Sequence, residues 1–94
     1  MRINRKCASL LKLCFEHPYD TYRERALNGL IAIRCIKALE YVCFNHPYDW
    51  FKEKALEALI KLGARRALEN VALNHPCDSF RERALAALGA RCEI

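Results

Sequence analysis

The chain has 94 residues, of which 53% are hydrophobic and 29% charged, and its formal net charge is +5 at pH 7. This length allows one small domain, and this composition excludes wholesale disorder because the chain can bury a core. Only three glycines and three prolines are present, which argues against a turn-rich β fold, whereas the abundant Ala, Leu, Glu, Arg and Lys favour helices. The composition therefore predicts one helical domain over residues 1–94.

The first predicted helix covers residues 6–16. Leu10, Leu13 and Cys14 lie there at helical spacing, which places their side chains on one face. The helix ends at His17, because the proline that follows disfavours helical geometry at the residue before it. We therefore expect an amphipathic first helix whose apolar face packs on the next element.

A second predicted helix covers residues 21–33 and directly follows Asp20. The Asp20 carboxylate is expected to act as the N-cap by accepting hydrogen bonds from the free amides of the first turn. The apolar stripe of this helix contains residues at helical spacing, namely Tyr22, Ala26, Leu30 and Ile33, with Leu27 at its edge. The two helices together form a pair joined by a short turn.

The same unit recurs twice more along the chain. It begins with His17, His46 and His75, spaced 29 residues apart, each followed by proline and then, at the third position, by aspartate. A lone helix pair cannot bury its apolar face, but three stacked pairs can share a continuous core. The sequence predicts an all-α fold, a short α-solenoid of three two-helix repeats with about six helices. The repeats cover approximately residues 6–34, 35–63 and 64–92.

The ends of the second helices differ between the repeats. Gly63 is expected to be the residue that ends the helix in the second repeat, because glycine readily adopts the left-handed conformation used there. Arg34 occupies the matching position in the first repeat. We therefore expect the first of these turns to be closed in a different way.

The repeated unit resembles the HEAT repeat, and more closely the short HEAT-like repeats of phycobilisome lyase-type proteins. The resemblance rests on the segment 80–85 and its two counterparts, in which an aromatic residue precedes a basic residue, Glu, a basic residue, Ala and Leu. In that family an aspartate six residues before the first basic residue forms a ladder with it between repeats, but histidine stands there in this chain. Because this chain departs from the family pattern there, we hypothesise that other aspartates replace it and that the histidines are neutral turn residues. The replacing pairs would be Asp20 with Arg23, Asp49 with Lys52 and Asp78 with Arg81.

The histidines are not expected to form a catalytic or metal site. Stacked helix layers lie roughly 10 Å apart, so His17, His46 and His75 cannot converge on one substrate atom. The C-x-x-H pairs that begin at Cys14 and Cys43 could supply zinc ligands, but these cysteines lie on an apolar face where the third repeat has alanine. No catalytic residue, metal or cofactor is therefore expected, and the chain is not expected to be an enzyme.

Arg25, Lys54 and Arg83 form a basic row along the second helices, with one residue in each repeat. A row of glutamates runs beside it, which is typical of a solvated surface with ion pairs. The alternative is that the basic row follows a phosphate backbone, which the net positive charge would favour. Nucleic-acid binding therefore stays open beside protein binding.

Trp50 is the only tryptophan, and its counterparts are Thr21 and Ser79. It lies in the first turn of a second helix and points outward on the helical wheel. It is either an exposed interface anchor or lies flat on a neighbouring turn. If it is an anchor, Tyr19 and Tyr48 at the matching turn positions extend the same patch. Trp50, Tyr19 and Tyr48, together with the basic row, are the candidate binding residues.

Four of the six cysteines lie in predicted helices or at their edges, where small apolar residues would fit equally well: Cys7, Cys14, Cys35 and Cys43. The apolar run near the N-terminus is broken by charges and lacks the pattern of a signal peptide. No segment has the length of apolar sequence that a bilayer requires. We therefore expect reduced thiols in a cytoplasmic protein without a membrane segment.

These features predict a non-enzymatic HEAT-like module that acts as a protein-protein interaction scaffold. Nucleic-acid binding through the basic row is the alternative. The resemblance also implies a tetrapyrrole lyase-related role, but those relatives are much longer, and three repeats cannot enclose a bilin. The first helix is apolar over more than one face, which leaves open a homo-oligomer formed through exposed terminal helices.

Overall fold

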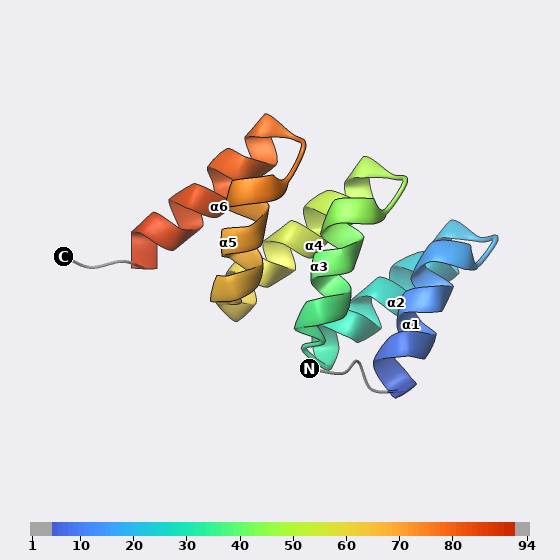
Figure 1. Ribbon diagram of the computed structural model, residues 1–94. Helices are drawn as coiled ribbons and strands as arrows, with labels where there is room; N and C mark the ends of the chain where they lie inside the picture. The colour runs from blue at the N-terminus through green and yellow to red at the C-terminus, as the bar shows by residue number, and fades with distance from the viewer. Residues whose placement is uncertain (1–4, 92–94) are drawn as a thin grey trace.

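In the computed structural model, which describes residues 5–91, the chain forms a row of six helices, and these residues contain no strand. The helices are α1 (Arg5–Glu16), α2 (Asp20–Ala32), α3 (Ile36–Asn45), α4 (Asp49–Leu62), α5 (Arg65–Asn74) and α6 (Asp78–Arg91). Each odd-numbered helix packs on the even-numbered helix that follows it, and the three pairs line up in chain order with their internal turns along one edge (Figure 1). The predicted all-α solenoid is confirmed. No described helix is long and apolar enough to cross a membrane.

The core lies between the two helices of each pair and continues from one pair to the next. Its largest fully buried apolar side chains recur at matching positions of the repeats: Leu27, Leu30, Leu39, Leu56, Leu59, Leu68, Val42 and Val71. Two residues of the predicted second stripe are exposed instead, namely Tyr22 of α2 and Ile33 directly after it, as is Leu13 of α1. Tyr22 and Leu13 belong to the first pair, and their counterparts in the later pairs are buried. Position in the row, and not the helical wheel alone, therefore decides the burial.

The aspartates at the starts of α2, α4 and α6 are not N-caps, contrary to the sequence-based expectation. Asp20 and Asp49 are the first helical residues, and the caps before them are Tyr19 and Tyr48, which make no side-chain capping bond. A carboxylate one position into the helix still interacts favourably with the positive end of the helix dipole. It also reaches the basic residue three positions on, and such an ion pair forms in all three repeats.

The turns after α2 and α4 are closed in the same way, so the prediction of two different closures was wrong. Arg34 has a φ of 56° and Gly63 a φ of 66°, both in the left-handed region. In each turn this residue donates its N–H to the carbonyl three positions back, and the next residue donates to the carbonyl five positions back, at 3.0–3.1 Å. This is the Schellman pattern of helix termination. In the first repeat the left-handed residue is Arg34, whose Cβ makes this conformation less favourable than it is for glycine.

The cysteines fall into two groups, and the expectation of reduced thiols was wrong for one of them. Cys7 and Cys35 form a disulfide between α1 and the residue before α3, with a Cα–Cα distance of 6.3 Å. Cys14 and Cys43 are free and buried, as expected for core thiols, and Cys77 is free and exposed. The sixth cysteine lies outside the described residues. The disulfide therefore links the first helix pair covalently to the second.

Candidate functional site

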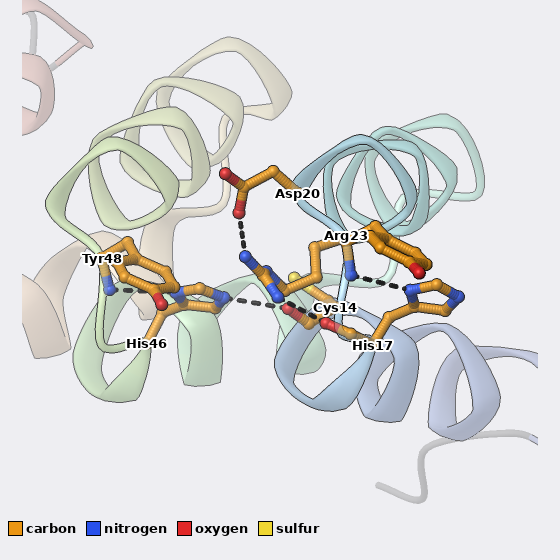
Figure 2. Close-up of polar contacts among 7 residues, drawn as sticks. Cys14, His17, Asp20, Arg23, His46 and Tyr48 are labelled. Carbon is orange, nitrogen blue, oxygen red and sulfur yellow. Dashed lines mark hydrogen bonds and ion pairs between the residues drawn. The ribbon is translucent and has the colours of Figure 1, made fainter.

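Two buried histidines, His46 and His75, connect neighbouring helix pairs, and Figure 2 shows the first of them. The His46 ring accepts the Tyr48 N–H at Nδ1, at 3.2 Å, so its proton lies on Nε2, which donates to the Cys14 carbonyl at 2.9 Å. His75 repeats both contacts, with the Cys77 N–H at 3.1 Å and the Cys43 carbonyl at 2.8 Å. The predicted role in the turn is confirmed. The hydrogen bond to the preceding repeat was not predicted.

Aromatic rings enclose these two histidines. The His46 ring stacks on Phe51 of its own repeat at 4.2 Å between centroids and contacts Phe15 of the preceding repeat at 4.8 Å. His75 lies in the same way between Phe80 and Phe44. Burial lowers the pKa of His46, and the positive charges of Arg23 and Lys52 lower it further. Both ring nitrogens of each histidine are used in hydrogen bonds, so these side chains hold the fold together and are not free to act as bases or metal ligands.

The buried thiols do not suit metal binding either. Burial raises the pKa of Cys14 to about 11 and that of Cys43 to about 12, because desolvation disfavours the thiolate that a metal requires. In the described part of the chain, no three His, Cys, Asp or Glu side chains gather where they could hold a metal ion. Cys14 and Cys43 contribute instead to the apolar core.

Arg23 is the second link between the first two repeats. Its guanidinium donates to the His17 carbonyl and to the Asp20 carboxylate, and it lies 5.3 Å from the centre of the Tyr48 ring (Figure 2). The anionic partner implied by the HEAT resemblance is therefore the aspartate of the same repeat. The Asp–basic ion pairs therefore lie within single repeats, and the polar contacts between the first two repeats include the His46–Cys14 hydrogen bond and the contact of Arg23 with Tyr48.

A groove lies between the N-terminal ends of α2 and α4, beside Arg23. Its volume is about 480 Å³, and it is lined by Asp20, Thr21, Arg23, Glu24, Tyr48, Trp50 and Phe51. Trp50 packs edge-on against Phe51, with 5.1 Å between the ring centroids, and remains about half exposed. The Lys54 ammonium lies 5.5 Å from the centre of the Trp50 ring. Trp50 is therefore a partly immobilised aromatic side chain at the edge of a hollow surface.

The groove brings together only part of the predicted binding patch. Tyr48 and Trp50 line it, whereas Tyr19 is exposed beside His17 and Tyr22 in the first repeat. The sequence-based reasoning missed the acidic side of the groove, formed by Asp20 and Glu24. Their spacing of four residues, which places both on one face of α2, is the signal that could have identified them.

The basic row is present, but each member already has a partner. Arg25 lies 5.8 Å from the centre of the Tyr22 ring, and Lys54 lies on Trp50 as described. The Arg83 guanidinium is 3.9 Å from the Glu57 carboxylate. The row therefore has the mixed, partnered character of a solvated helix face.

Comparison of the chain with protein-family models, with curated proteins and with solved structures finds no match. The groove and the two ends of the helix row are the candidate binding surfaces of the described residues.

Proposed function

We propose that this chain is a non-enzymatic, HEAT-like repeat module that binds a protein partner in the groove between α2 and α4. The observation that carries the proposal is the pair of half-exposed aromatic side chains, Tyr48 and Trp50, on one side of this groove. Tryptophan, tyrosine and arginine are the residues that most often dominate the energy of a protein interface. The groove contains one of each.

Neighbouring side chains already restrict the Trp50 side chain in the free protein. Phe51 and Lys54 contact its ring before any partner arrives. A side chain that is already held loses less conformational entropy when a partner packs against it, so more of the interaction energy appears as affinity. Trp50 therefore fits the part of a rigid anchor.

The charges around the groove favour a particular type of partner. Asp20 and Glu24 present exposed carboxylates on one side, and the Arg23 guanidinium is engaged by Asp20 and by the His17 carbonyl. The groove lining thus has two carboxylates against one guanidinium, a net charge of −1, in a chain of net charge +5. A peptide segment with an apolar side chain beside lysine or arginine fits this surface, whereas a phosphate backbone is repelled from it.

The test is titration of a set of fluorescently labelled twelve-residue peptides that combine one Leu or Phe with either Lys and Arg or Glu. We expect the basic members to bind, and we expect Trp50→Ala or Tyr48→Ala to weaken that binding by roughly 10- to 30-fold. Tyr41→Ala is the matched control, because Tyr41 is an equally exposed aromatic residue that lies on α3. Asp20→Asn with Glu24→Gln should remove the preference for basic peptides.

Two outcomes would contradict the proposal. One is the absence of peptide binding, or binding that Trp50→Ala leaves unchanged. The other is tight binding of a labelled oligonucleotide that falls steeply between about 50 and 200 mM salt and is lost when Arg25, Lys54 and Arg83 are replaced by glutamine. The second result would assign the function to the basic row and to nucleic acid.

A further inference from the structure

The contact surface between neighbouring helix pairs occurs twice in the chain, between the first and second pairs and between the second and third. We call the side of a helix pair that contacts the following pair its rear face, and the side that contacts the preceding pair its front face. Each contact therefore joins the rear face of one pair to the front face of the next. At the two ends of the row, one front face and one rear face have no neighbour among the described residues.

The rear face of the third pair is centred on Leu73 of α5 and Leu85 of α6. Leu85 is 64% exposed, whereas its counterparts Leu27 and Leu56 are both 0% exposed. Leu73 is 78% exposed, and its counterparts are the phenylalanines that pack on His46 and His75 in the inner contacts. This end therefore exposes apolar positions that the following pair covers elsewhere in the row.

The front face of the first pair is centred on Leu13, His17 and Tyr22. Leu13 is 45% exposed and Tyr22 is 50% exposed, whereas their counterparts in the second and third pairs are at most 5% exposed. His17 keeps the turn contact of its Nδ1 with the Tyr19 N–H at 3.2 Å. Among the described residues, no carbonyl accepts a hydrogen bond from its Nε2. The front face of the first pair therefore has the same kind of surface that covers a rear face in the two inner contacts.

The polar groups of the two end faces also match each other. In each inner contact, the histidine Nε2 donates to a carbonyl in the last turn of the preceding odd-numbered helix, where carbonyls lack partners within the helix. Ala72 supplies the corresponding carbonyl in α5, and His17 supplies the corresponding donor at the other end. Arg81 and Tyr19 likewise correspond to Arg23 and Tyr48, which are in contact within the chain.

One further pair adds charge complementarity. Asn70 donates to the Glu40 carboxylate at 2.6 Å across the inner contact between α3 and α5. The positions that would meet at the ends hold Glu69, the counterpart of Glu40, and Lys12, the counterpart of Asn70. Opposite charges therefore face each other if the row continues.

From these matches we propose that a second copy of this chain docks the front face of its first pair on the rear face of the third pair, continuing the helix row head to tail. The interface is heterologous, so each copy keeps one free face and the association does not close after two copies. This inference goes beyond the protein-binding role, because the groove between α2 and α4 lies away from both end faces. Trp50→Ala should leave the association unchanged.

The test uses two full-length variants, each with one face blocked. Leu73→Glu with Leu85→Glu blocks the rear face, and Leu13→Glu with Tyr22→Glu blocks the front face. All four residues are exposed, so circular dichroism should show that both variants stay folded. In sedimentation velocity, we expect the unmodified chain to gain mass with concentration past that of a dimer. Each variant alone should keep the mass of one chain, 10.9 kDa.

Mixing the two blocked variants in equal amounts gives the decisive result. Each variant keeps the face that the other has lost, so the mixture should form a dimer and nothing larger. Three results would overturn the inference: an unmodified chain that stays monomeric at every concentration, a mixture that stays monomeric, or an unmodified dimer that neither double substitution disrupts. The last result would indicate a symmetric interface elsewhere.

Discussion

At the scale of single residues, the histidines perform a task that the backbone cannot perform for itself. The last carbonyls of a helix have no intrahelical donor, and a neighbouring helix has no free N–H to offer at its centre. The His46 ring bridges this distance, since it accepts from its own turn at Nδ1 and donates to the Cys14 carbonyl at Nε2. His46 and His75 are therefore connectors between repeats as well as turn residues.

This role makes stability depend on the protonation of His46. A second proton on Nδ1 would remove the hydrogen bond from the Tyr48 N–H, and burial already lowers the pKa of His46 below its ordinary value of 6.5. A group whose pKa is lower in the folded state binds protons preferentially in the unfolded state. Its contribution is therefore fully present above pH 6.5 and is lost as the pH falls through the folded-state pKa.

As the pH is lowered from about 8 to 5, we expect the free energy of unfolding of the unmodified chain in urea to hold down to about pH 6.5 and to fall below it. His46→Gln should lower it by about 2 kcal/mol at the higher pH, because the ring contacts and the bond at Nδ1 are lost. The difference between the two proteins should then shrink at low pH, since the variant has no imidazole to protonate. A difference that is constant over this range would contradict the assignment.

How much of this was predictable differs between the two ring nitrogens. The contact of Nδ1 is local, and the His-Pro turn was enough to suggest it. The contact of Nε2 joins residues 32 positions apart, and its partner depends on the offset between stacked helix pairs. The sequence period shows that pairs repeat, but it does not show by how much one pair is shifted along the next. The groove beside Trp50 could not be predicted for the same reason, because part of its lining comes from α2 of the preceding pair.

At the scale of the helices, sequence patterns predicted the boundaries well and the chemistry of the ends less well. Proline after His17 marks the first break, and the observed α1 ends at Glu16. The position of Asp20 suggested a cap, but the chain enters the helix one residue earlier than expected, which turns that carboxylate toward Arg23. One residue is within the usual uncertainty of a helix boundary, yet it changes the role of the side chain.

The shared closure of α2 and α4 leads to a matched pair of substitutions. Arg34 occupies the left-handed region at an energetic cost that glycine does not have. Arg34→Gly should therefore stabilise the chain by about 1 kcal/mol, and Gly63→Arg should destabilise it by about the same amount. Thermal unfolding of the two variants beside the unmodified chain measures both effects. Shifts of the same sign would show that the two turns are not equivalent.

At the scale of the whole molecule, the disulfide makes the first two helix pairs different from the third. Cys7 and Cys35 are separated by 28 positions, one less than the repeat period, which places them at adjoining points of successive pairs. The similarity between this separation and the repeat period is visible in the sequence and indicates that the two cysteines lie close together. The lack of a signal-peptide pattern predicts reduced thiols, and only the repeat period indicates that these two cysteines meet.

The disulfide should contribute measurably to stability. Closing a loop of this length restricts the unfolded chain by about 3.5 kcal/mol. A reductant such as a phosphine should therefore lower the urea midpoint, and Cys7→Ser with Cys35→Ser should reproduce the reduced protein. Cys77→Ser is the control, since Cys77 is free and exposed and its loss should change nothing. An unchanged midpoint under reduction would show that the bond does not constrain the fold.

The nearest-neighbour arrangement of the helices has a consequence for folding during synthesis. Each helix of the row contacts only helices of its own pair and of the adjoining pairs (Figure 1). Proteins built from such local contacts fold in microseconds to milliseconds. During synthesis, the first pair can pack as soon as it leaves the ribosome, and every later pair arrives at a surface that is already formed. Translation order and assembly order therefore coincide.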